Sequence, residues 1–134
     1  MGLEDSKKVK VLLIDDEEDF GIIVKLNLEK TGKYDVFLAT DGVTGIKTAK
    51  KVKPDVILLD LMMPVTDGTE TYKQLGEGIT TKNVPVIFLT ALATKEDVED
   101  GKGTIGTKHF IAKPVLTEDL IRRIDAVLRR NRID

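Results

Sequence analysis

Two short apolar runs that end in acids constrain the fold of this chain more than any other feature. Val56–Leu59 ends in Asp60, and Val11–Ile14 ends in the pair Asp15 and Asp16. Apolar runs of this length, bounded by turn residues, are typical of strands buried on both faces of a parallel sheet. Because the carboxyl ends of parallel strands meet at one edge of the sheet, we expect the three carboxylates to lie together there.

Three neighbouring carboxylates predict a metal site. They repel one another, and at least one would stay protonated unless a cation offsets the charge. Oxygen ligands suit hard divalent cations, so Mg²⁺, Mn²⁺ or Ca²⁺ would fit. Asp15, Asp16 and Asp60 are therefore candidate metal ligands.

Apolar stretches alternate with helical patterns along the whole chain. The expected strands cover about 9–14, 34–39, 56–60, 84–89 and 108–112. The expected helices cover about 18–31, 42–51 and 69–75, with two more starting at Thr94 and Thr117. Right-handed crossovers between such strands give a parallel sheet with helices on both faces. The helix from Thr94 should be short or irregular, because Val98 is its only large apolar residue before Gly101.

Helical spacing of apolar residues predicts which side chains face the core. The expected inward residues are Phe20, Ile23, Val24 and Leu28 in the first helix, and Val43, Ile46 and Ala49 in the second. In the last helix they are Leu120, Ile121, Ile124, Val127 and Leu128.

Composition limits the function classes. A chain of 134 residues fits one domain, and its net charge of −2 argues against a general nucleic-acid-binding surface. No apolar run is long enough to span a membrane, and no signal peptide opens the chain. There is no cysteine, which suits a reducing compartment. We therefore expect a cytoplasmic protein that binds neither nucleic acid nor membrane through this domain.

Two further strand ends carry polar groups. Thr90 follows the fourth expected strand and Lys113 the fifth. The acid pair Asp15 and Asp16, the single Asp60, the threonine and the lysine each follow an apolar strand. In this order they resemble the receiver domain of two-component response regulators.

The resemblance implies the whole architecture. The fold would be flavodoxin-like, a (βα)5 three-layer α/β sandwich around a parallel five-stranded sheet of order 2-1-3-4-5. Residues 9–130 would form the receiver domain. Residues 1–8 would be a flexible N-terminal segment, and 131–134 a tail or the start of a linker.

The resemblance also implies a reaction. Asp60 would accept a phosphoryl group from the phosphohistidine of a sensor histidine kinase or phosphotransfer protein. Mg²⁺, with Mn²⁺ as a substitute, would be held by Asp15, Asp16, Asp60 and the backbone carbonyl of Met62. The domain would act as a signalling module, and its only catalysis would be its own phosphorylation and slow self-dephosphorylation.

Three other residues take roles from the same resemblance. Lys113, joined to Pro114 by a cis bond, would bind one phosphoryl oxygen, and the Thr90 hydroxyl another. Phe110 matches the switch aromatic, whose rotation would change the face formed by the helix from Thr94, the fifth strand and the last helix. A downstream effector domain or protein would bind this face, which also leaves a phosphorylation-dependent homodimer open.

Met62 and Leu92 stand where receiver domains tune the lifetime of the phosphoryl group. Both are apolar, so neither can orient an attacking water. We expect slow hydrolysis, over many minutes to hours.

Other functions fit the residues less well. A flavodoxin needs a phosphate loop where this chain has the acids of 15–19. An aspartate-based phosphohydrolase needs an acid in the place of Met62. A pseudo-receiver acting as a constitutive protein-interaction module remains the main alternative, although the complete set of site residues argues against it.

Overall fold

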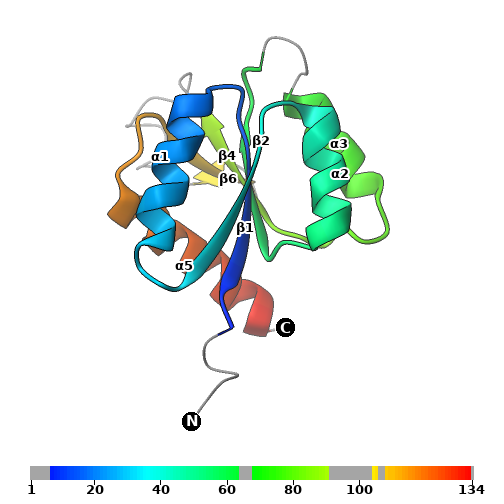
Figure 1. Cartoon of the computed structure of the whole chain (residues 1–134). Helices are drawn as coiled ribbons and strands as arrows, with labels where there is room; N and C mark the ends of the chain where they lie inside the picture. The colour runs from blue at the N-terminus through cyan, green and yellow to red at the C-terminus, as the bar shows by residue number, and fades with distance from the viewer. Residues whose placement is uncertain (1–6, 64–67, 91–103, 106–107, 134) are drawn as a thin grey trace.

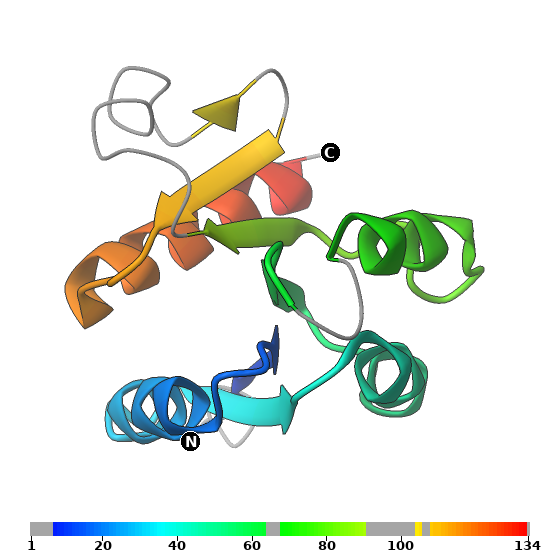
Figure 2. The ribbon, with the colours of Figure 1, turned by 90° about the horizontal axis from the view of Figure 1, so that it is seen from above.

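A parallel sheet forms the centre of the molecule, and helices cover both of its faces. The computed structural model describes residues 7–63, 68–90, 104–105 and 108–133. In these ranges α1 and α5 cover one face of the sheet and α2 and α3 the other (Figures 1 and 2). The helix predicted from Thr94 lies outside the described residues, as does Leu92.

The elements alternate as predicted. The strands are β1 (Val9–Ile14), β2 (Tyr34–Ala39), β3 (Val56–Asp60), β4 (Val86–Thr90), β5 (Thr104–Ile105) and β6 (Lys108–Ala112). The helices are α1 (Glu18–Glu29), α2 (Gly42–Val52), α3 (Gly68–Glu77) and α5 (Thr117–Ile133).

The strand order is β2-β1-β3-β4-β6-β5. The five longer strands are parallel, which confirms the predicted flavodoxin-like order, with β6 as its fifth strand. The edge strand β5 was not predicted. It pairs antiparallel with β6, Thr104 opposite His109, and its two residues are too few to show a strand periodicity.

The central strands are buried on both faces, as expected for a parallel sheet. Val11 and Leu13 of β1 pack in a core with α1 and α5, and Leu12 and Ile14 pack in a second core with α2 and α3. Every residue of β3 is buried. The strand ends that bear the acids are therefore fixed from both sides.

One prediction about α1 is wrong. Val24 and Leu28 are buried, but Ile23 is 57% exposed. Gly21 takes the inward position instead, where a Cβ would already lie 3.5 Å from Leu38 Cδ2. An apolar stripe read from side chains alone misses a glycine on the inward face of a helix.

The same error occurs in α2. Val43 is 60% exposed, whereas Ala49 is buried and Ile46 half-buried. Gly45 faces β1 so closely that a Cβ there would lie 2.5 Å from Ile14 Cδ1. The absent side chain again sets which face of the helix points inward.

Other helix predictions are confirmed. In α5 the inward face contains Leu120, Ile124, Val127 and Leu128, with Ile121 half-buried. At the start of α2 the Asp41 side chain accepts a hydrogen bond from the Thr44 N–H at 2.7 Å and so caps the helix. No helix of the described ranges has both the length and the apolar character needed to cross a membrane.

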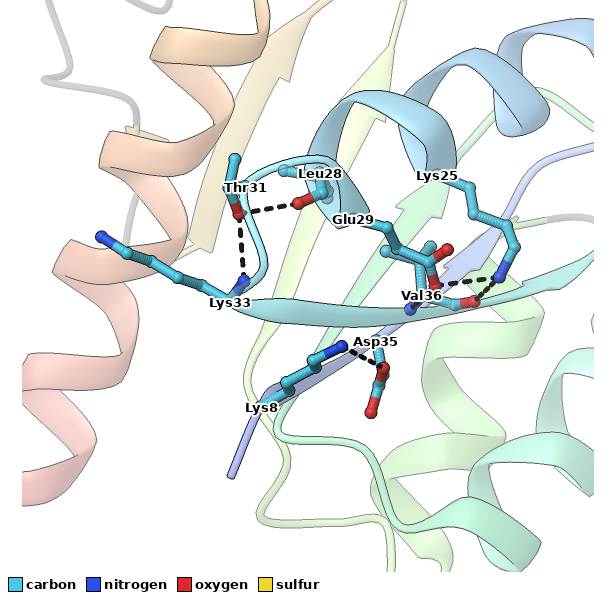
Figure 3. Close-up of polar contacts among 8 residues, drawn as sticks. All are labelled: Lys8, Lys25, Leu28, Glu29, Thr31, Lys33, Asp35 and Val36. Carbon is cyan, nitrogen blue, oxygen red and sulfur yellow. Dashed lines mark hydrogen bonds and ion pairs between the residues drawn. The ribbon is translucent and has the colours of Figure 1, made fainter. Parts of the chain in front are cut away.

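Side chains of α1 cover part of the free edge of β2 (Figure 3). The Val36 N–H donates to Glu29 Oε2 at 2.9 Å, and Lys25 Nζ donates to the Val36 carbonyl at 2.8 Å. Lys25 and Glu29 also bind each other at 3.0 Å. We call Lys25, Glu29 and Val36 the β2-edge cluster. It satisfies backbone groups that an edge strand would otherwise leave unpaired.

Candidate functional site

The predicted site residues meet at the carboxyl ends of four neighbouring strands. Asp15 follows β1, Asp60 ends β3, Thr90 ends β4 and Lys113 follows β6. The first three are 2–3% exposed, so these polar groups lie inside the fold. The structure thus brings together residues that the sequence placed at separate strand ends. We call this region the acidic site.

The three candidate metal ligands converge. Asp15, Asp16 and Asp60 each offer a carboxylate oxygen, and these oxygens lie within 4.8 Å of one another. Asp15 and Asp60 are buried, while Asp16 is not. The donor set consists of oxygen atoms, as Mg²⁺ prefers.

Each buried acid uses one oxygen to fix its own loop. Asp15 Oδ1 accepts the Glu17 N–H, and Asp60 Oδ1 accepts the Met62 N–H, both at 2.9 Å. These are short-range side-chain-to-backbone turns that orient the carboxylates. Asp15 Oδ2 is buried and accepts no hydrogen bond of acceptable geometry from the described residues. A buried carboxylate oxygen of this kind fits a cation ligand.

Lys113 is the cation that the structure places among these acids. Its Nζ lies 2.9 Å from Asp15 Oδ2 and 3.5 Å from Asp60 Oδ2, and it donates to Glu17 Oε1. It also lies 4.5 Å from the centre of the Phe20 ring, a cation–π contact. The ammonium therefore has several partners at once.

Burial and charge act in opposite directions in the acidic site. Burial raises the pKa of Asp15 above its ordinary value, and the nearby Lys113 only partly offsets this. For Lys113, burial alone would lower the pKa, but the hydrogen bond to Glu17 and the nearby carboxylate of Asp15 raise it above its usual range. The lysine stays charged, whereas ionised Asp15 is disfavoured, a situation that a bound divalent cation would relieve.

Backbone contacts tie Thr90 to Lys113. The Lys113 N–H donates to the Thr90 carbonyl at 3.1 Å. The Lys113–Pro114 peptide bond is cis, the form that the resemblance implied. The residues that carry the hydroxyl and the ammonium, Thr90 and Lys113, are thus held together by a backbone hydrogen bond at the ends of β4 and β6.

Phe110, the expected switch aromatic, packs in a row of rings. It stacks on Phe88 with centroids 5.1 Å apart, and Phe88 meets the edge of Tyr72 at 4.9 Å. The row runs on the side of the sheet that α2 and α3 cover.

A cavity of about 550 Å³ opens beside the acids. Its lining residues are Asp16, Glu17, Phe20, Asp60, Met62, Lys113 and Pro114. Of these lining residues, Met62 is 56% exposed. Asp60 therefore lies in the wall of this cavity, together with Lys113.

Sequence reasoning missed two members of the site. The sequence assigned no role to Glu17, and Phe20 was expected only to face the core. Both contact Lys113, which is 96 positions from Glu17. No local pattern signals contacts across that separation.

Comparison with known proteins identifies the family. The sequence pattern of the response regulator receiver domain matches residues 11–125. The chain belongs to this family. Receiver domains are signalling domains of two-component response regulators.

Curated relatives of this receiver domain are regulators. It is 38% identical over 121 residues to the DNA-binding dual master transcriptional regulator RpaA of Synechocystis, covering 90% of this chain and 49% of RpaA. It is 38% identical to the alkaline phosphatase synthesis transcriptional regulatory protein PhoP of Bacillus subtilis, covering 92% of this chain and 50% of PhoP. The chain thus spans about half the length of the curated relatives it matches.

Solved structures share the fold. The chemotaxis protein CheY4 of Vibrio cholerae is 31% identical with a TM-score of 0.77, covering 90% of this chain and 99% of that one. The receiver domain of the sensor histidine kinase PA1611 from Pseudomonas aeruginosa is 27% identical with a TM-score of 0.75, covering 91% and 98%. That protein is described with a magnesium ion coordinated in its active site cleft.

Proposed function

We propose that this receiver domain accepts a phosphoryl group on Asp60 from a phosphohistidine of a histidine kinase or phosphotransfer protein. The observation that carries the proposal is the position of Asp60. Its carboxylate ends β3 inside the fold, has Lys113 Nζ 3.5 Å from Oδ2, and lines the cavity. A carboxylate so placed is reachable by a phosphoryl donor and sits beside a fixed cation.

The transfer balances without any other reactant. A carboxylate oxygen of Asp60 forms a bond to phosphorus, and the phosphorus–nitrogen bond of the phosphohistidine breaks. The electron pair of that bond stays on the imidazole of the donor. The product is an acyl phosphate on Asp60.

Asp15, Asp16 and Asp60 would hold Mg²⁺, with Mn²⁺ as a substitute and the Met62 carbonyl as a further ligand. Their convergence and the buried Asp15 Oδ2 support this assignment. When bound, the ion offsets the repulsion between phosphoryl oxygens and carboxylates.

Lys113 and Thr90 would bind the phosphoryl oxygens. Lys113 supplies a charge close to Asp60, and Thr90 supplies a hydroxyl from the end of the adjacent strand. Because the Lys113 N–H donates a hydrogen bond to the Thr90 carbonyl, movement of one residue would displace the other.

We infer that the output is read on the face of the molecule formed by β6, which carries Phe110, and by α5. This is an outer face of the domain and not one of the two faces of the sheet. Repacking of Phe110 against Phe88 would change this face after phosphorylation. The reader would be an effector domain or a partner protein, since the relatives are regulators about twice as long. The same face would also support a phosphorylation-dependent homodimer. The compartment that we propose is the cytoplasm.

The test is intact-mass spectrometry after incubation with Mg²⁺ and acetyl phosphate. The parent should gain one phosphoryl group. Asp60→Asn should gain none, and neither should the parent in excess chelator. If calorimetry shows Mg²⁺ binding but the parent gains no mass, the pseudo-receiver alternative is favoured.

Met62, an apolar residue that lines the cavity, supports slow loss of the phosphoryl group. An asparagine there could orient a water toward phosphorus, so Met62→Asn should shorten the lifetime, and Leu92→Glu should add to this. Mass spectrometry over time after removing acetyl phosphate measures the decay. Unchanged decay in the double variant would refute the tuning role.

A further inference from the structure

The side chain of Glu17 binds Lys113 rather than the start of its own helix. Glu17 is the N-cap residue of α1, where a polar side chain commonly accepts a backbone N–H of the first helical turn. Its side chain makes no such bond. It accepts a hydrogen bond from Lys113 Nζ instead. The Glu17 side chain therefore leaves the start of α1 uncapped and contacts Lys113 of the acidic site.

Glu17 differs from the other acids around Lys113. Asp15 and Asp60 lie inside the fold, but the Glu17 side chain is 61% exposed and lines the cavity. Asp60, the proposed phosphoryl acceptor, is farther from Nζ, at 3.5 Å, than Asp15 at 2.9 Å. The ammonium has three N–H donors. One of them is directed to a carboxylate at the rim of the cavity.

We propose that Glu17 is a positioning residue that holds Lys113 at the rim and competes with the phosphoryl group for its ammonium. The inference rests on the proposed role of Asp60. A phosphoryl oxygen on Asp60 and the Glu17 carboxylate would then draw on the same ammonium. The carboxylate of Glu17 would therefore lower the affinity of the site for the phosphoryl group at a given Mg²⁺ occupancy.

The probe is beryllium fluoride, which binds carboxylates as a phosphoryl analogue, measured by calorimetry at saturating magnesium chloride. Glu17→Gln should lower its Kd about two- to fivefold, the range expected for a partly exposed ion pair. Glu17→Asp keeps the charge and favours the helix cap, but is one methylene shorter. Its Kd should match that of Glu17→Gln if the contact with Lys113 matters. Its Kd should match that of the parent if only the negative charge matters, and this would contradict a positioning role. Glu18→Gln, the adjacent exposed acid, is the matched control and should leave the Kd unchanged.

A second readout needs no analogue. NMR of the lysine side chains, with Lys113 assigned through Lys113→Arg, should show a shifted Lys113 signal in Glu17→Gln and Glu17→Asp but not in Glu18→Gln. Equal Kd values in the parent and the Glu17 variants, together with an unshifted Lys113 signal, would overturn the role of Glu17. The proposed role of Asp60 would be unaffected. Failure of the parent to bind beryllium fluoride would overturn the role of Asp60 and the competition with it.

Discussion

Lys25 and Lys113 each bind a carboxylate beside the sheet, but the clusters around them are balanced differently. In the β2-edge cluster, Lys25 meets one acid, Glu29, and both side chains also bind the backbone of Val36. Every charge has its partners. The hydrogen bond from the Val36 N–H, followed by that from Lys25, holds the pKa of Glu29 below its usual value.

The acidic site has the opposite balance. Within the described ranges, Lys113 is the cation that faces Asp15, Glu17 and Asp60, and burial raises the pKa of Asp15. A cluster that favours its own charged form stabilises the fold. A cluster that holds a buried carboxylate in its ionised form, although burial favours the protonated form, costs stability. Such clusters are typical of functional sites. Charge balance alone therefore distinguishes the two clusters.

The largest expected effect tests how tightly the acidic site is built. A Cβ at Gly68 would lie 2.4 Å from the Asp60 carbonyl oxygen and 2.6 Å from the Leu61 Cα, and backbone atoms cannot rotate away. Gly68→Ala should lower the free energy of unfolding by about 2–3 kcal/mol. Gly76→Ala, in the same helix with no atom within 4 Å, should raise it by about 0.5–1 kcal/mol. Urea unfolding measures both, and equal effects would contradict the packing described.

The next effect concerns Asp15. Because its pKa is raised in the folded state, ionisation costs stability as the pH rises from the ordinary value of 3.8 through the folded pKa. Without metal at pH 7, Asp15→Asn should raise the free energy of unfolding by about 1 kcal/mol. The gain should vanish below the ordinary pKa, where both states are protonated. Asp16→Asn, at a less buried position, should gain less; destabilisation by Asp15→Asn would reverse the comparison between the clusters.

The smallest effect concerns Glu29 and has the opposite sign. A depressed folded pKa gives stability that is present above the ordinary value of 4.5 and is lost as the pH falls through the folded pKa. At pH 7, Glu29→Gln should lower the free energy of unfolding by about 0.5 kcal/mol, since the pair is partly exposed. Thermal unfolding at several pH values should show the difference closing in acid. A constant difference would mean that the charge of Glu29 is not involved.

Much of this molecule follows from its sequence because the decisive signals are local. An apolar strand that ends in an acid carries its own boundary, so Asp15 and Asp60 could be placed at one sheet edge from sequence alone. The order of the strands came from family resemblance. Ile23 and Val43 were misplaced because glycines at 21 and 45, which have no hydrophobic signal, occupy the inward positions.

The remaining gaps are contacts made across the chain. Nothing near Glu17 or Phe20 indicates that both touch Lys113, and nothing near Glu29 indicates that it binds the Val36 N–H. Such contacts depend on how α1 sits against the strands. That position is set by close packing, which sequence periodicity describes only coarsely.

The row of rings from Tyr72 to Phe110 gives this protein its own optical probe. The chain has two tyrosines and no tryptophan. Tyr34 starts β2, at the other edge of the sheet, and burial followed by the charge of Asp125 raises its pKa to about 12. Tyr72 touches Phe88, which stacks on Phe110. If the proposed repacking of Phe110 occurs, a change in tyrosine emission would therefore come from Tyr72, so the proposed switch could be followed by fluorescence without attaching a dye.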